Sequence, residues 1–147
     1  MVVEASNVER DDAVLREKRG AVRVLIIDDH RDAAEMAGLL LTMRGFGVAL
    51  AFSGEDALKQ ARETPFDVAF IDLQMPHMDG YATAAAFRSD PTLGGVALIA
   101  LTGCGSTADF ARTSAAGFAL HLVKPATLHA LEDAIFDVVA LAAKPAD

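Results

Sequence analysis

Five short apolar runs alternate with helical segments along most of this chain, and this alternation restricts the fold more than any other feature. Each run is apolar at consecutive positions rather than at every second one, which is typical of strands buried on both faces of a sheet. Strands alternating with helices form parallel sheets through right-handed crossovers, with helices on both faces. The sequence therefore predicts an α/β fold with a doubly wound five-stranded parallel sheet. The predicted strands span residues 21–28, 48–52, 66–72, 95–102 and 118–123, and the predicted helices span 32–44, 54–63, 81–89, 106–116 and 126–143.

Start and stop signals support several of these helices. Ser53 is a plausible N-cap for the second helix, and Pro65 follows its end. Ser106 and Asp109 have the spacing of a capping box for the fourth helix, and Gly117 is its expected stop.

Apolar residues recur at helical spacing in the first and last helices. In the first helix they place Ala33, Met36, Ala37, Leu40 and Leu41 on one helical face. The expected core face of the last helix consists of Leu128, Leu131, Ile135, Val138 and Val139.

Charge and composition restrict the domain organisation and the partners. Residues 1–20 are rich in charges of both signs and are expected to form an arm or linker, before a domain over residues 21–143 and a tail over 144–147. A net charge of −8 without a basic stripe argues against nucleic-acid binding. No apolar run approaches the length of a membrane span, no secretory signal is present, and the single Cys104 cannot form an internal disulfide. A cytoplasmic protein is the default expectation.

Polar residues that suit chemistry follow four of the five predicted strands. Asp28 and Asp29 end the first strand, Asp72 the third, Thr102 the fourth and Lys124 the fifth. Ligands of open α/β sheets bind outside the carboxyl ends of the strands, so these residues are expected to converge on one crevice. Each feature alone is weak, since an acidic pair after a strand is often a helix cap; the pattern rests on their joint occurrence.

Three carboxylates in one crevice repel each other, and a hard divalent cation such as Mg²⁺ would compensate their charge and leave a coordination position for a phosphate oxygen. The ammonium group of Lys124 and the hydroxyl of Thr102 would complete an electrophilic clamp for a phosphoryl group. One carboxylate is then the acceptor, and Asp72 on the central strand is best placed for this role.

These residues, together with the segments "DLQMPHMDG", "ALTG" and "LVKP", resemble the receiver domain of two-component response regulators and hybrid histidine kinases, over residues 22–142. The resemblance implies a flavodoxin-like sheet with strand order 2-1-3-4-5. It also implies Mg²⁺-dependent transfer of a phosphoryl group from a phosphohistidine of a histidine kinase or histidine phosphotransfer domain. Such a domain is a signalling domain rather than an enzyme, with at most self-phosphorylation and self-dephosphorylation.

The resemblance also implies roles for individual residues. These are Asp72 as phosphoacceptor, Asp29 as direct Mg²⁺ ligand, Asp28 as ligand mostly through a bound water, the Gln74 main-chain carbonyl as further ligand, and Thr102 and Lys124 as contacts of the phosphoryl group. In the family the bond before the proline of the "LVKP" segment is usually cis, so a cis Lys124–Pro125 bond is expected. Pro76 and Gly80 are expected to shape the loop after Asp72.

Three positions need separate comment: one departs from the family pattern, and two are positions that tune phosphoryl lifetime in the family. His121 stands where the family usually has Tyr or Phe; it is either a side chain on the outer edge of the strand or a replacement of the aromatic switch that adds pH sensitivity. Gln74 and Cys104 occupy positions that tune phosphoryl lifetime, and Cys104 is either an inert loop thiol or an oxidation target. The other histidines, His30, His77 and His129, have no partner at metal-ligand spacing and are interpreted as solvated surface residues.

Competing functions remain open at this point. One alternative is a receiver-like module that binds partners without phosphorylation. In either case, the resemblance implies that downstream partners bind the face formed by residues 106–116, 118–123 and 126–143. A dehalogenase-type phosphatase would need an acid where Gln74 stands, and a flavin carrier would need a neutral loop where Asp28 and Asp29 stand. We expect either a stand-alone receiver or a module of a longer hybrid kinase, and the charged arm favours the module.

Overall fold

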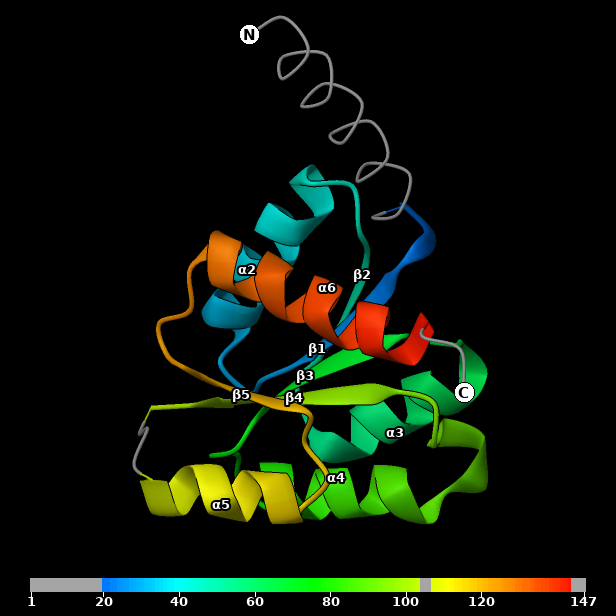
Figure 1. The fold of residues 1–147 in the computed structure, drawn as a ribbon. Coiled ribbons are helices and arrows are strands. Elements are labelled where there is room, and N and C mark those ends of the chain that lie inside the picture. Colours follow the sequence, from blue (N-terminus) through cyan, green and yellow to red (C-terminus); the bar gives the residue numbers. More distant parts are fainter. Residues whose placement is uncertain (1–19, 104–106, 144–147) are drawn as a thin grey trace, which may run out of the picture.

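The computed structural model describes residues 20–103 and 107–143, without the side chains of 107–109 and 141–143. Within these residues one sheet contains β1 (Arg23–Ile27), β2 (Gly47–Ala51), β3 (Val68–Asp72), β4 (Ala97–Thr102) and β5 (Leu120–Val123). The helices, labelled as in Figure 1, are α2 (Arg31–Met43), α3 (Gly54–Glu63), α4 (Gly80–Ser89), the short 3-10 helix η1 (Pro91–Leu93), α5 (Thr107–Ala115) and α6 (Leu128–Ala143).

The sheet has the predicted topology. All neighbouring strands are parallel, in the order β2-β1-β3-β4-β5. Every residue of β3 is buried, and so is every residue of β1 except Arg23, whereas the edge strands β2 and β5 are mostly half-buried. Continuous apolar runs therefore indicate two-sided burial best for the central strands, because an edge strand has a neighbour on one side alone.

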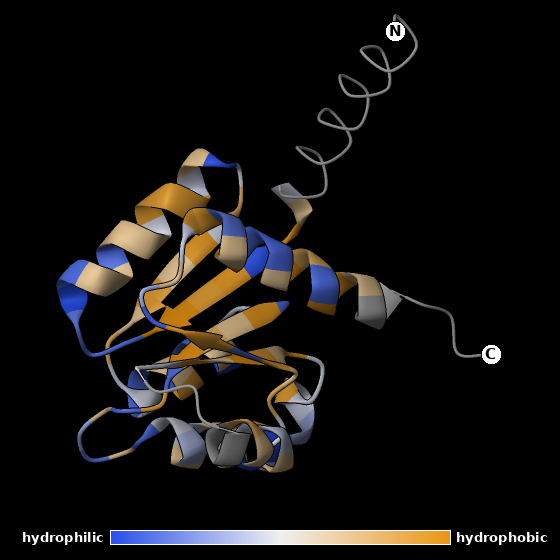
Figure 2. Cartoon of the chain, turned by 60° about the vertical axis from the view of Figure 1, so that its left-hand side comes forward, coloured by the Kyte–Doolittle hydropathy of each residue, from blue (hydrophilic) through white to orange (hydrophobic). Residues whose placement is uncertain are grey.

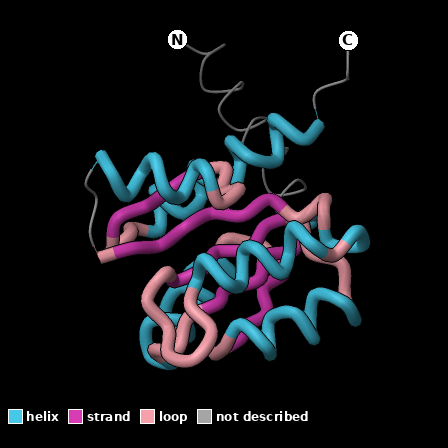
Figure 3. The backbone as a smooth tube through the Cα atoms, turned by 90° about the horizontal axis from the view of Figure 1, so that it is seen from below, coloured by secondary structure: helices cyan, strands magenta, loops and turns pink. Residues whose placement is uncertain are grey.

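Helices cover both faces of the sheet. In Figure 1, α2 and α6 lie on one face and α3, α4 and α5 on the other, and the strands run between these two layers in Figure 3. Each face of the sheet has its own hydrophobic core, and neighbouring residues of β3 pack into different ones. Phe70 packs with Leu41 and Ile135, whereas Ile71 packs in the core that contains Phe87. Burying a side chain of this size contributes about 2–3 kcal/mol. Figure 2 shows the strands as strongly hydrophobic, between helices that also carry hydrophilic residues.

Several predicted helix ends are confirmed. The Ser53 hydroxyl accepts the Asp56 N–H at 3.1 Å and caps α3, which ends at Glu63, two residues before Pro65. Helix α5 ends shortly before Gly117, whose φ of +97° needs a residue without a Cβ. The expected capping box of Ser106 lies outside the described residues.

The apolar residues predicted on one face of α2 do share a face, since Ala33, Met36, Ala37 and Leu40 line the same groove. The buried residues of the helix are Ala34, Gly38 and Leu41, whereas Met36 is 58% exposed. A Cβ on Gly38 would lie 2.9 Å from the Leu50 side chain, so this glycine allows the helix to lie close to β2. Counting apolar residues missed this because glycine carries no side chain to count.

The core face of α6 agrees with the prediction. Leu131, Ile135 and Val138 are buried, and Leu128 and Val139 pack against the same core. No helix in the described ranges 20–103 and 107–143 has the length and apolar character needed to cross a membrane.

Candidate functional site

The polar residues that end or follow four strands lie together at one edge of the sheet. Asp28 follows β1, Asp72 and Thr102 end β3 and β4, and Lys124 follows β5. These strands are parallel neighbours, so their carboxyl ends meet. Asp28, Asp72 and Thr102 are only 2%, 3% and 4% exposed. The structure thus places three polar side chains in the interior at one point of the molecule, where an uncompensated polar group is costly.

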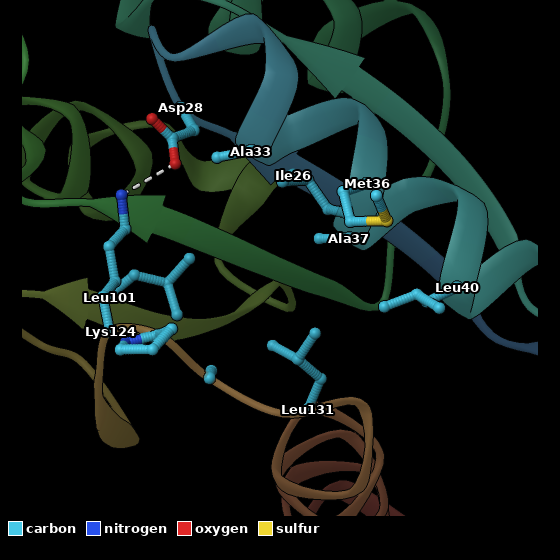
Figure 4. Close-up of a pocket in the computed structure, with 11 residues that line it drawn as sticks. Ile26, Asp28, Ala33, Met36, Ala37, Leu40, Leu101, Lys124 and Leu131 are labelled. Carbon is cyan, nitrogen blue, oxygen red and sulfur yellow. Dashed lines mark hydrogen bonds and ion pairs between the residues drawn. The ribbon is translucent and has the colours of Figure 1, made fainter.

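Lys124 is the cation of this group. Its Nζ lies 2.8 Å from Asp28 Oδ2, the ion pair drawn in Figure 4, and 3.4 Å from Asp72 Oδ2. The Lys124–Pro125 peptide bond is cis, as expected, and the Lys124 N–H donates to the Thr102 carbonyl at 2.6 Å. The main chain after β5 is therefore tied to the end of β4, which holds the lysine stem over the carboxylates.

Asp72 has one hydrogen-bonded oxygen and one oxygen without a hydrogen bond. The Gln74 N–H donates to Oδ1 at 3.1 Å. Oδ2 is inaccessible to solvent and has no hydrogen-bond partner among the described residues, although the Lys124 ammonium group lies nearby. This oxygen therefore faces the charged groups of the cluster.

The loop after Asp72 packs tightly against the strand end. The Gly80 N–H donates to the Leu73 carbonyl at 3.1 Å, and a Cβ on Gly80 would lie 2.6 Å from the Asp72 carbonyl oxygen. Glycine is therefore required by close packing, which is the physical reason for its place in the "DLQMPHMDG" segment. Asp79 then caps α4 by accepting the Ala82 N–H at 2.8 Å.

The charges of the cluster shift the pKa values in different directions. Burial alone would raise the pKa of Asp28, but hydrogen bonds from Lys124 and from the His30 N–H outweigh it and lower this pKa. Burial raises the pKa of Asp72, and the negative charge of Asp28 adds to the rise. Burial acts to lower the pKa of Lys124, yet its contacts with the two carboxylates raise it. Lys124 is thus held charged by Asp28, and Asp72 is the more basic carboxylate of the two.

The cluster carries more negative than positive charge. Half-buried Asp29 stands beside Asp28 and Asp72, and its Oδ1 likewise lacks a hydrogen bond to any residue that the structure describes. Three carboxylates thus face one close lysine ammonium group. Oxygen ligands with surplus negative charge are what Mg²⁺ binds in proteins, so the acidic cluster fits a Mg²⁺ site.

His30 is an exposed residue, as expected, but it belongs to this cluster, so the expectation that it has no partner at metal-ligand spacing is wrong. The side chain is 68% exposed, but Nδ1 lies 3.2 Å from Asp28 Oδ1 and 3.4 Å from Asp29 Oδ1. Sequence spacing missed it because Asp72, the remaining member, comes from another strand. The signal available was its position directly after the acidic pair. His77 and His129 are exposed, as expected, and His129 lies 3.3 Å from Asp133.

A cavity lies at the carboxyl ends of β3 and β4. It has a volume of about 550 Å³ and is lined by Leu73, Gln74, Met75, Asp79, Tyr81, Thr102 and Arg112. Thr102, the expected contact of the phosphoryl group, and Gln74, an expected tuning residue, therefore line the same space. Arg112 lies 3.9 Å from the centre of the Tyr81 ring. Sequence reasoning missed Arg112, because nothing in its helix distinguishes it from a solvated charge.

An apolar groove adjoins the cluster on the side of α2 and α6. Figure 4 shows Ala33, Met36, Ala37 and Leu40 of α2 facing Leu131, with the Asp28–Lys124 pair at one end. The groove has a volume of about 440 Å³. Its lining is apolar apart from the Asp28–Lys124 pair.

His121 lies on the edge strand β5 and is half-buried against α5. Its Nδ1 lies 3.0 Å from the Thr113 hydroxyl, and its ring centre lies 4.2 Å from that of Phe110. Nε2 is buried and has no hydrogen bond to the described part of the chain. Cys104 lies outside the described residues, so its role stays a prediction.

Known proteins share both the fold and the sequence pattern. A family model described as the response regulator receiver domain matches residues 24–136. The chain is 32% identical over 118 residues to the transcriptional regulatory protein ZraR of Salmonella typhimurium, covering 80% of this chain and 26% of that protein. It is 27% identical over 124 residues to the CAI-1 autoinducer sensor kinase/phosphatase CqsS of Vibrio cholerae, covering 84% of this chain and 18% of that protein.

The solved structure of the chemotaxis protein CheY4 of Vibrio cholerae is similar with a TM-score of 0.76, at 29% identity, over 80% of this chain and 98% of that chain. The chain therefore spans about a quarter or less of these two curated relatives, but nearly all of this solved chain. Because the family model covers most of the chain and the sheet order agrees, the chain belongs to the response regulator receiver domain family.

Proposed function

We propose that this receiver domain accepts a phosphoryl group on Asp72 from a phosphohistidine and thereby changes the binding of a downstream partner. Receiver domains of this family act in two-component signalling and interact with histidine kinases or phosphotransfer proteins. The observation that supports Asp72 most directly is its buried, unbonded Oδ2, 3.4 Å from Lys124 Nζ. The Asp72 carboxylate is thus a nucleophile held next to a cation that can neutralise the incoming phosphoryl charge.

The chemistry asks little of the protein beyond positioning and charge. One oxygen of the Asp72 carboxylate supplies an electron pair to phosphorus while the N–P bond of the phosphohistidine breaks. The leaving nitrogen keeps that bond's electron pair and, with a proton on the other ring nitrogen, departs as neutral imidazole. Lys124 contacts a phosphoryl oxygen, and the Thr102 hydroxyl donates to another as charge develops.

The acidic cluster would hold the Mg²⁺ ion on which this transfer depends. Asp29 and Asp72 would bind it directly, Asp28 mostly through water, and the Gln74 carbonyl would complete the set of protein oxygens. When bound, the ion supplies positive charge to the phosphoryl oxygens and offsets the surplus of carboxylates. The Gln74 side chain and Cys104 would tune how long the phosphoryl group survives attack by water. The domain's own chemistry is then limited to self-phosphorylation and self-dephosphorylation.

A small-molecule phosphodonor with Mg²⁺, followed by intact-mass measurement, tests this proposal. The parent protein should gain the mass of one phosphoryl group, and Asp72→Asn should gain none. The matched control is Asp133→Asn, an exposed carboxylate on α6, which should behave like the parent. An unmodified parent, or a phosphorylated Asp72→Asn, would refute Asp72 as acceptor.

The alternative function, partner binding without phosphorylation, finds less support. The acidic cluster, Thr102 and Lys124 lie together, and a module that only binds partners does not need three buried polar groups at that point. Partner binding that is the same for the parent and for Asp72→Asn, with and without phosphodonor, would favour this alternative.

For the output of the signal, we propose the face of α5, β5 and α6, with His121 as the switch residue. His121 contacts two α5 residues, Thr113 and Phe110, so a movement of its ring on phosphorylation would be felt by that helix. Amide hydrogen exchange of α5 with and without phosphodonor tests this role. Phosphorylation should change the exchange in the parent, and His121→Ala should remove the change while Asp72 is still phosphorylated. An unchanged response in that variant would exclude the switch role.

The proposed receiver extends over residues 21–143, with residues 1–20 as an arm or linker and 144–147 as a tail. We favour the arrangement in which this receiver is a module of a hybrid kinase, in line with the similarity to CqsS. Cytoplasmic placement, with the kinase or phosphotransfer domain as phosphodonor, follows from this role.

A further inference from the structure

The imidazole of His30 lies among the oxygens of the acidic cluster. Its Nδ1 is 3.2 Å from Asp28 Oδ1, 3.4 Å from Asp29 Oδ1 and 3.8 Å from Asp72 Oδ2. His30 is the N-cap residue of α2, but its side chain makes no capping hydrogen bond. The ring therefore turns toward three carboxylates from two strands instead of toward its own helix.

The spacing of these atoms fits one coordination sphere. For metal–ligand bonds of about 2.1 Å, neighbouring ligands of an octahedral ion lie about 3.0 Å apart and opposite ligands about 4.2 Å apart. One ligand atom from each of Asp28, Asp29, His30 and Asp72 falls within 4.8 Å of all the others. Small side-chain adjustments are enough to bring nitrogen and oxygen atoms at these separations onto a single cation.

A second observation points to a ligand at this place. Asp72, whose side chain is 4% exposed, and half-buried Asp29 each present a solvent-inaccessible oxygen with no hydrogen bond to the described residues. Lys124 Nζ lies 3.4 Å from the Asp72 oxygen, but neither oxygen has a hydrogen bond that would replace those lost with water on burial. A cation bound between them would satisfy both oxygens, and His30 Nδ1 lies within 4 Å of each.

We propose that His30 is a nitrogen ligand of the metal site, so that this receiver binds divalent transition cations such as Mn²⁺, Co²⁺ or Zn²⁺ in preference to Mg²⁺. This inference rests on the proposed metal site and adds a selectivity to it. Mg²⁺ is satisfied by carboxylates, carbonyls and water, whereas imidazole nitrogen favours the transition cations. His30 would replace one water of the ion and leave the carboxylate ligands in place.

The exposure of His30 makes this role compatible with the metal-free geometry. Without a metal, a proton on Nδ1 can be donated to Asp28 Oδ1 at 3.2 Å. On metal binding the neutral ring can carry its proton on Nε2 instead, where water serves as partner because the side chain is 68% exposed. The exchange of a proton donor for a metal ligand thus needs no rearrangement of the core.

Binding of Mn²⁺, Zn²⁺ and Mg²⁺ to the whole chain, measured separately by titration calorimetry at one mildly alkaline pH, tests this selectivity. His30→Asn should weaken binding of Mn²⁺ and Zn²⁺ by at least about tenfold and leave that of Mg²⁺ within about twofold. The matched control is His129→Asn, because His129 beside Asp133 is another histidine–carboxylate pair, on α6. This control should keep the parent's affinities.

Pulsed electron paramagnetic resonance of bound Mn²⁺ gives a direct readout. The parent and His129→Asn should show modulation from a directly bound nitrogen, which excess Mg²⁺ removes by displacement, and His30→Asn should lack it. Absence of the nitrogen signal from the parent, or an equal loss of Mg²⁺ and Zn²⁺ affinity in His30→Asn, would overturn the inference.

The phosphodonor assay separates the two proposals. If His30→Asn still gains a phosphoryl group with Mg²⁺, the proposed function stands and the spectrum alone decides the role of His30. If the parent shows the nitrogen signal yet accepts no phosphoryl group with any of the three cations, the proposed function fails and the ligand assignment remains.

Discussion

The two ends of helix α2 contain buried charge that is handled in opposite ways. At the C-terminal end, Arg44 donates from Nε and Nη2 to Oε1 of buried Glu132, at 3.1 and 2.9 Å. At the N-terminal end, the carboxylates of Asp28, Asp29 and Asp72 face the single lysine ammonium group of Lys124. One end has balanced charges joined by hydrogen bonds, and the other keeps a surplus of negative charge.

This difference separates a structural ion pair from a functional one. The Arg44–Glu132 pair joins α2 to α6 and needs no ligand to complete it. The acidic cluster is balanced only when a cation joins it, and it leaves oxygens of Asp29 and Asp72 without hydrogen bonds to any described residue. Burial of charge alone therefore does not mark a site, whereas burial with incomplete compensation does.

Removing the cation of the cluster should have the largest effect. Lys124→Met leaves Asp28 and Asp72 buried without their ammonium partner and should lower the free energy of unfolding by about 3 kcal/mol without Mg²⁺. Urea unfolding measures this loss, and Mg²⁺ should restore part of it. The control Lys59→Met, an exposed residue of α3, should change little. A loss as small as that of the control would mean that Lys124 does not compensate the cluster.

Adding Mg²⁺ should stabilise the protein through the acidic cluster at the N-terminal end of α2, and not through the Arg44–Glu132 pair at the C-terminal end. At a Mg²⁺ concentration of about 100 times Kd, the parent should gain about 2.7 kcal/mol in the free energy of unfolding. Asp29→Asn should lose most of this gain because a direct ligand is removed, whereas Arg44→Met should keep it. Equal gains in parent and Asp29→Asn, seen in thermal unfolding, would place the ion elsewhere.

Breaking the balanced pair should have a moderate effect. Glu132→Gln replaces a buried carboxylate by a neutral amide, which cannot pair with Arg44 in the same way, and should cost about 1–2 kcal/mol. The estimate is modest because the Arg44 side chain is 48% exposed. Urea unfolding should give the same loss with and without Mg²⁺, and the neighbouring exposed Asp133→Asn serves as control. A loss that depends on Mg²⁺ would show that the two ends of α2 are not independent.

Replacing the Asp72 carboxylate by an amide should raise the free energy of unfolding instead of lowering it, and this effect should be the smallest of the four. The pKa of Asp72 is raised in the folded protein, so its ionised form opposes folding at pH values above its folded pKa. Asp72→Asn removes that charge and should raise the free energy of unfolding by about 1 kcal/mol at neutral pH without Mg²⁺. The gain should fade as the pH falls through the raised pKa, because the parent then becomes protonated. Destabilisation at neutral pH would contradict the surplus of charge.

The sequence predicted the sheet well because strands buried on both faces need apolar residues at consecutive positions. It predicted the helices from caps and stops such as Ser53 and Gly117, which act locally. It did not indicate which residues of α2 are buried, because the packing of this helix depends on the close approach of Gly38 to Leu50, a contact with another element. The resemblance to a known family added the strand order and the cis Lys124–Pro125 bond.

For the candidate site, order along the chain indicated Asp28, Asp72, Thr102 and Lys124, because the carboxyl ends of parallel strands must share an edge. His30 was missed although it directly follows Asp28 and Asp29, because the direction of its ring depends on the folded loop. Arg112 was missed because its neighbour Tyr81 comes from another helix. Position 121 showed only that a histidine replaces an aromatic residue. Its contacts with Phe110 and Thr113 depend on how α5 packs against β5.

The amino-acid sequence by itself determined the α/β architecture and which polar groups stand at the strand ends, since both follow from local periodicity and from the direction of parallel strands. Only the tertiary structure decided which charges are compensated. Compensation depends on distances between side chains of different elements and on how much water the packing excludes, as for Lys124 between Asp28 and Asp72, 2.8 and 3.4 Å away. The strand determines the position of the aspartate main chain, but the packed neighbouring side chains determine the surroundings of its carboxylate and therefore its pKa.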